Sequence, residues 1–105
     1  MTDAIVALST VGNAGDAQRI GRALVERRLV ACVNVVPGVT SIYAWKGSVT
    51  TDSELLLVIK TRRAKLDEVR SALLELHPYE VPELIALPIE GGHGAYLEWI
   101  EDSVS

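Results

Sequence analysis

Residues Val30 to Arg62 decide the fold, and they read VACVNVVPGVTSIYAWKGSVTTDSELLLVIKTR. β-branched and aromatic residues dominate this stretch, as they do in half-buried strands. Lys46-Gly47 lies near its middle, and Gly47 supplies the positive φ angle that a two-residue hairpin turn needs. The stretch therefore predicts two long antiparallel strands that fold back on each other at Lys46-Gly47.

The arms of this hairpin are long for a small domain. The first arm, Ala31–Trp45, has 15 residues and would span about 50 Å, whereas a compact domain of this chain length is roughly 35 Å across. Pro37-Gly38 interrupts this arm, and because proline cannot donate to a central ladder, it predicts an edge, a bulge or a bend. We expect the hairpin to bend there and another subunit to cover its apolar tip, which carries Ile42, Tyr43, Trp45 and Val49.

The rest of the chain predicts helices and strands on either side of the hairpin. In chain order they are a buried strand at 4–8, a helix at 14–28, a helix at 63–76, a strand at 84–87 and a short helix at 96–100. Asn13 and Thr61 are the expected N-caps, and His77-Pro78 ends the second helix. The order β-α-β-β-α-β with a C-terminal helix is the ferredoxin-like α+β pattern, and residues 1–105 form a single domain. Two helices cover one face of such a sheet, so the other face favours self-association.

Composition and charge narrow the class of protein. The net charge of −4 disfavours nucleic-acid binding, which needs clustered lysine and arginine. The longest apolar run, Leu55–Ile59, has strand length, well short of the roughly 18 residues that suggest a membrane span. Cys32 is the only cysteine, so no intramolecular disulfide can form, as is usual in a reducing compartment. We expect a cytoplasmic protein without nucleic-acid or membrane partners.

Two places in the sequence offer metal ligands. His77 lies beside Tyr79, Glu80 and Glu83, and an imidazole with carboxylates suits copper, zinc or nickel; a histidine that only caps the helix is the alternative. Cys32 offers a thiolate for Cu(I), or it is simply a small buried side chain. No P-loop, nucleophile elbow or paired-cysteine motif is present, so we expect no enzyme.

Several segments together resemble the CutA family of divalent-cation tolerance proteins. They are ACVN at 31–34, PGVTSIY at 37–43 with WKG at 45–47, ELLLVIKT at 54–61, HPYEVPE at 77–83 and YLEW at 96–99. The resemblance covers essentially the whole chain, in order. It implies a cytoplasmic homotrimer similar in architecture to PII signalling proteins, with clefts between subunits and a role in tolerance to copper and other divalent metals.

The resemblance also bears on the ligands. Family members with proposed metal sites carry a cysteine at the end of the first strand and a His-His pair before the proline, where this chain has Ser9 and Leu76-His77. His77 therefore remains from that set, and Cys32 matches a cysteine that the family carries in its second strand. With Glu80, these are the predicted metal ligands, for copper or alternatively zinc, without an organic cofactor.

A second hypothesis is a PII-like signalling or interaction module. Its intersubunit cleft would bind a small anionic ligand or a partner protein. Large aromatic residues are common at interfaces, and Lys60 with Glu54 flanks the apolar end of the second hairpin arm. The predicted cleft residues are Tyr43, Trp45, Glu54, Lys60, Tyr79, Glu83 and Trp99.

Overall fold

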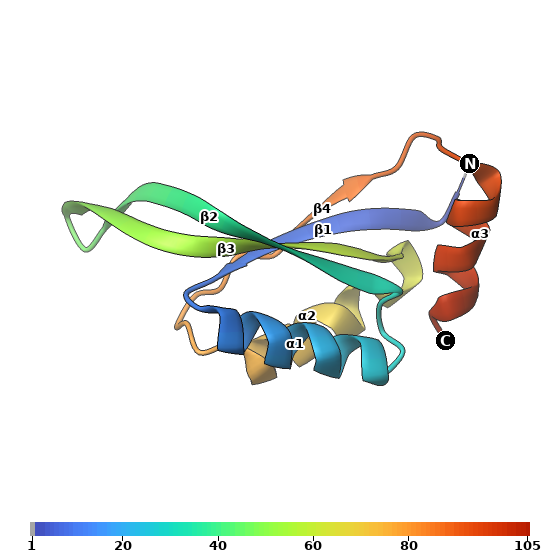
Figure 1. Ribbon diagram of the computed structural model, residues 1–105, viewed down its shortest axis with the longest axis horizontal. Coiled ribbons are helices and arrows are strands. Elements are labelled where there is room, and N and C mark those ends of the chain that lie inside the picture. Colours follow the sequence, from blue (N-terminus) through green and yellow to red (C-terminus); the bar gives the residue numbers. More distant parts are fainter. Residues whose placement is uncertain (1) are drawn as a thin grey trace.

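A computed structural model describes residues 2–105, and its most prominent element is the predicted hairpin (Figure 1). Strands β2 (Cys32–Trp45) and β3 (Ser48–Arg62) pair antiparallel from Cys32 opposite Lys60 to Trp45 opposite Ser48, with one irregularity between Val36 and Val39. The turn residues Lys46 and Gly47 have φ angles of 50° and 82°, as a type I′ hairpin turn requires. The hairpin projects beyond the rest of the sheet and gives the molecule its longest dimension, 44 Å against 25 and 22 Å.

The sheet has four antiparallel strands in the order β2-β3-β1-β4. Strand β1 (Ala4–Val11) pairs with β3 on one side and with β4 (Ile85–Pro88) on the other. Together with the helices α1 (Ala14–Glu26) and α2 (Leu66–Leu76), this order confirms the predicted ferredoxin-like α+β fold. Helix α3 (Gly94–Ser103) follows β4 and starts two residues earlier than the sequence predicts.

The helix boundaries confirm one predicted cap and correct another. Asn13 caps α1, because its Oδ1 accepts a hydrogen bond of 2.8 Å from the backbone N–H of Asp16. The prediction for Thr61 was wrong. Strand β3 continues through this residue, and its buried Oγ1 donates to the carbonyl of Leu29 at 2.6 Å. A 3₁₀ turn, Arg63–Lys65, therefore precedes α2 without a side-chain cap.

The core lies between one face of the sheet and helices α1 and α2. Alternate residues of β1 are buried there, whereas Val6 and Leu8 on its other face are only partly buried. The prediction of a buried strand is therefore correct for one face of β1 and wrong for the other. Ile100 of helix α3 and Val104, which follows the helix, cover one end of this other face. The remainder stays open, and its apolar residues are Val6, Leu8, Val36, Leu56, Val58, Ile85 and Leu87.

The Pro37-Gly38 interruption is a bulge, which is one of the three alternatives that the sequence predicts. Val36 pairs with Leu56 and Val39 pairs with Glu54, so two residues of β2 lie opposite one residue of β3. Gly38 has a φ angle of 80°, which glycine adopts without strain. Beyond the bulge, the side chains of Ser41, Tyr43 and Trp45 lie on the same face of the hairpin as those of Asp52 and Glu54.

No helix within residues 2–105 has the length and apolar character needed to cross a membrane.

Candidate functional site

The bulged face of the hairpin and the loop after α2 enclose an open cavity of about 600 Å³, here called the hairpin groove. Four carboxylates and three aromatic rings line it, and no lysine or arginine among the described residues does. Its full lining is Thr10, Ser41, Ile42, Tyr43, Trp45, Asp52, Glu54, Tyr79, Glu80, Val81 and Glu83. One surface thus combines negative charge with flat apolar walls.

Glu54 is the most buried carboxylate of the hairpin groove, with 8% of the residue exposed. Its Oε2 accepts a hydrogen bond of 2.6 Å from the hydroxyl of Tyr79, its only side-chain hydrogen bond to the described part of the chain. None of the salt bridges within residues 2–105 involves Glu54. A buried carboxylate is costly without a compensating charge, so this position favours a cation.

His77 anchors the loop that carries Tyr79. The ring is buried, with 6% of the residue exposed. Its Nε2 lies 2.8 Å from the carbonyl oxygen of Thr10 and its Nδ1 lies 3.2 Å from the backbone N–H of Tyr79. Because a carbonyl only accepts and an N–H only donates, Nε2 carries the proton and Nδ1 accepts. Both ring nitrogens are therefore engaged by the backbone.

Tyr79 is held by its neighbours on three sides. Its ring meets the His77 ring edge-on at 4.6 Å between centroids. Its hydroxyl bonds Glu54, and it lies so near Gly12 that a Cβ atom on Gly12 would be 3.2 Å from it. The absence of a side chain at Gly12 thus makes room for the Tyr79–Glu54 hydrogen bond.

The electrostatics reflect the crowding of carboxylates. Burial, followed by the hydrogen bond to Glu54, raises the pKa of the Tyr79 hydroxyl. Burial and then the nearby charge of Glu54 raise the pKa of Glu83. At the outer end of the groove, Tyr43 donates a hydrogen bond to Asp52, and this bond is the main cause of its raised pKa. Burial is the largest cause of the raised pKa of Tyr79 and Glu83, and in all three groups a neighbouring carboxylate adds to the shift, an effect that a bound cation would oppose.

The structure brings five of the seven predicted cleft residues together in one chain: Tyr43, Trp45, Glu54, Tyr79 and Glu83. Lys60 lies elsewhere, because it is six residues further along β3, where its ammonium donates to Asn34. Trp99 lies on α3 and stacks on Tyr96, with 5.5 Å between ring centroids. The sequence reasoning did not select Asp52, although its position two residues before Glu54 puts it on the same strand face.

The predicted metal ligands His77, Cys32 and Glu80 do not form one cluster. Cys32 lies at the start of β2, where its Sγ is 3.9 Å from the Tyr96 hydroxyl, whereas Glu80 lines the hairpin groove. Within residues 2–105, no group of three histidine, cysteine or acidic side chains could hold a metal ion. A metal site with three side-chain ligands would therefore need ligands from a second chain, and the metal assignment stays a prediction.

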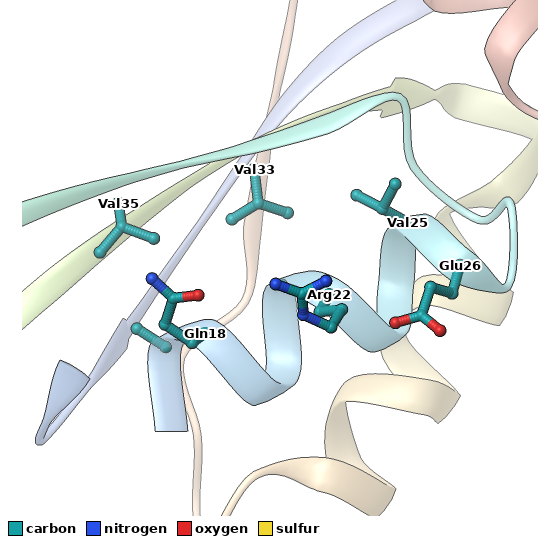
Figure 2. Close-up of a pocket in the computed structure, with 8 residues that line it drawn as sticks. Gln18, Arg22, Val25, Glu26, Val33 and Val35 are labelled. Carbon is teal, nitrogen blue, oxygen red and sulfur yellow. The ribbon is translucent and has the colours of Figure 1, made fainter. Parts of the chain in front are cut away.

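A second, smaller cavity of about 350 Å³ lies between α1 and the edge strand β2. Figure 2 shows Val33 and Val35 of β2 facing the helix, with the polar side chains of Gln18, Arg22 and Glu26 nearby. A Cβ atom on Gly21 would lie 3.5 Å from Val33, so the helix approaches the sheet closely at this glycine. This cavity holds no cluster of carboxylates or aromatic rings comparable to the hairpin groove.

Residues 5–103 match the family described as "CutA1 divalent ion tolerance protein". The chain belongs to this family. The divalent-cation tolerance protein CutA of Thermus thermophilus is 49% identical over 98 residues, which are 93% of this chain and 95% of that protein. The chain spans less of some other CutA relatives, for example 58% of the Xenopus laevis homologue and 54% of the chloroplastic protein of Arabidopsis thaliana.

Solved CutA structures have the same fold. The PII-like protein CutA from Nostoc sp. PCC 7120 superposes with a TM-score of 0.89 at 33% identity, covering 96% of this chain and 97% of that one. The CutA from Archaeoglobus fulgidus, described as periplasmic, superposes with a TM-score of 0.94 at 34% identity, covering 97% and 99%. The PII-like fold of the single chain, which the sequence resemblance implied, is thereby confirmed.

Proposed function

We propose that this CutA1 family member is a cytoplasmic homotrimer that binds divalent cations, copper in particular, and so contributes to tolerance of them. The observation that carries the proposal is the unbalanced charge of the hairpin groove. It gathers Asp52, Glu54, Glu80 and Glu83 without a lysine or arginine from the described residues. Carboxylates at such density favour cation binding.

The proposed homotrimer is supported by the apolar surface that one chain leaves uncovered. At the hairpin tip, Ile42 is 70% exposed and Val49 79% exposed. The open sheet face adds Val36, Ile85 and Leu87, which are also exposed. Exposed apolar side chains in this number mark interaction sites in a soluble protein, and copies of the chain are the natural occupants. A second copy would also supply the ligands that one chain lacks.

The preference for copper follows from coordination chemistry. Nitrogen and oxygen ligands bind Cu²⁺ more tightly than the other first-row divalent ions, Zn²⁺ included. The hairpin groove offers oxygen ligands. His77 and Cys32 are the further ligands that the sequence predicts. To bind a metal, His77 would have to give up its hydrogen bond to Thr10 or to Tyr79.

Two measurements test this function. Light scattering should give the mass of three chains at micromolar concentration, and a monomeric mass would refute the trimer. Calorimetric titration with Cu²⁺ and Zn²⁺ should show binding that Glu54→Gln weakens about tenfold or more, since it removes one charged ligand. Glu75→Gln is the matched control, because Glu75 pairs with Arg27 on the exposed helix surface. Equal affinities in wild type and Glu54→Gln would remove the hairpin groove from metal binding, and a parallel His77→Ala titration tests the histidine.

The likeness to the PII-like Nostoc protein favours a second candidate, a signalling or interaction module. The charge of the hairpin groove argues for a cationic or neutral ligand there, so an anionic one would need Lys60 or a second chain. A thermal-shift screen of metabolites of either charge tests this candidate, and the absence of any shift would count against it.

A further inference from the structure

We propose that the hairpin groove also binds a small organic cation, an ammonium or guanidinium group carried on a short carbon chain. The proposal shares the site of the proposed function, but it does not depend on metal binding. In it, divalent ions and the organic cation compete for Glu54. Three observations on one chain support this ligand class.

The first observation is the unbalanced charge of Glu54. The residue is nine-tenths buried, yet the described residues give its carboxylate one hydrogen bond, to a neutral hydroxyl, and no ion pair. An ammonium or guanidinium can donate to a carboxylate in charge-assisted hydrogen bonds. It would therefore supply both the donor and the positive charge that this position lacks.

The second observation is the aromatic lining. Tyr43, Trp45 and Tyr79 contribute rings to the same cavity as the carboxylates. The faces of such rings attract cations, most strongly for tryptophan. The ammonium of Lys46 already lies 6.0 Å from the centroid of the Trp45 ring. Metal ions gain little from these rings, whereas alkylammonium and guanidinium groups bind them well.

The third observation is size and apolar contact. The cavity of about 600 Å³ is far larger than a bare ion, and Val81 adds aliphatic surface to its lining. Within residues 2–105 no three ligand side chains converge on a single point. A ligand with a carbon chain would fill this space, since burying its methylene groups is favourable.

The test compares three probes with the same four-carbon chain: butylammonium, butanol and butyrate. Trp45 is the reporter, in a Trp99→Phe variant that removes the other of the two tryptophans. The protein is kept free of metal with a chelator. We expect Trp45 fluorescence to titrate with butylammonium, and binding of butanol and butyrate to be weaker by about tenfold or more. Glu54→Gln should weaken butylammonium binding to the level of butanol, and Glu83→Gln should weaken it in the same direction. Glu75→Gln should leave it unchanged.

Three results would overturn the proposal: equal binding of butylammonium and butanol, unchanged binding in both Glu54→Gln and Glu83→Gln, or no binding in the metal-free protein. The last result is also the one expected if a lysine or arginine of a second copy already occupies the groove. Copper titration of the same variants separates this proposal from the proposed function. If the protein binds copper but not butylammonium, the organic-cation proposal is wrong and the metal-binding function stands. If it binds butylammonium but not copper, the metal-binding function is wrong and the organic-cation proposal stands.

Discussion

The hydroxyl of Tyr79 donates a hydrogen bond of 2.6 Å to Glu54, although 25 residues separate the two in the chain. This bond joins the loop after α2 to strand β3 at the residue that pairs with Val39, directly after the bulge. It therefore holds the loop and the hairpin, which are the two walls of the hairpin groove, together. It also places a neutral donor, rather than a cation, on the most buried carboxylate of the groove.

Removing the hydroxyl with Tyr79→Phe should destabilise the protein by about 1 kcal/mol, the usual net value of such a hydrogen bond. The melting temperature should fall by several degrees, as thermal unfolding followed by circular dichroism would show. Tyr96→Phe is the control, because the Tyr96 hydroxyl has only a contact of 3.9 Å to the sulfur of Cys32. Equal effects of the two substitutions would mean that the bond to Glu54 contributes no special stability.

Gly12→Ala should destabilise the protein through Tyr79. The new Cβ would lie 3.2 Å from the Tyr79 hydroxyl, which the bond to Glu54 keeps from moving away. In a Tyr79→Phe background that oxygen is gone, so the same substitution should cost less. A double-mutant cycle measures this coupling. Gly91→Ala is the control, since nothing lies near its Cβ position, and additive effects of Gly12→Ala and Tyr79→Phe would contradict the contact.

His77→Ala should destabilise the protein by about 2–3 kcal/mol, because it leaves the Thr10 carbonyl and the Tyr79 N–H without their buried partner. Urea unfolding of the two proteins gives this difference. His93→Ala is the matched control, since His93 is exposed and makes no capping hydrogen bond at the start of α3. A small effect at His77, similar to that at His93, would show that its two hydrogen bonds do not hold the loop.

Glu83 should make the protein less stable as the pH rises. Burial and the charge of Glu54 raise its pKa above the ordinary value of 4.5. In the window between that value and the raised pKa, the folded protein therefore holds a proton that the unfolded chain has released. Stability falls as the pH rises through this window. Glu83→Gln should remove this dependence and raise the melting temperature at neutral pH, and an unchanged melting curve from pH 4 to 8 would contradict the shift.

Local signals in the sequence were enough to predict the hairpin, its turn and its bulge. Lys46-Gly47 and Pro37-Gly38 restrict the backbone wherever they occur, so no tertiary information was needed. Thr61 shows where such reasoning ends. Its side chain suits a cap, but the pairing of β3 with β1 carries the strand past it, and its hydroxyl bonds Leu29 instead.

The candidate site was predictable only in part, because local signals select its residues but do not show which of them are in contact. Glu54 and Tyr79 were selected as members of one cleft, but their hydrogen bond depends on Gly12 and on the buried His77, which lie on other segments. Asp52 could have been predicted as a member of the groove, because the two-residue repeat of a strand puts it on the same face of β3 as Glu54. Lys60 shares the strand face of Glu54, but it lies too far along β3 to reach the groove.

The bulge at Pro37-Gly38 determines how the chain can change in length at this point. It holds one residue more on β2 than on β3, and strand side chains alternate between faces. Deleting one of the two residues would leave a single residue of β2 opposite Leu55, so the ladder would become regular. Tyr43 and Trp45 would then stay on the face of Glu54, and the strand would lose the bend and the added twist that a bulge produces. At this point the chain can therefore lose one residue without exchanging the two faces of the hairpin groove.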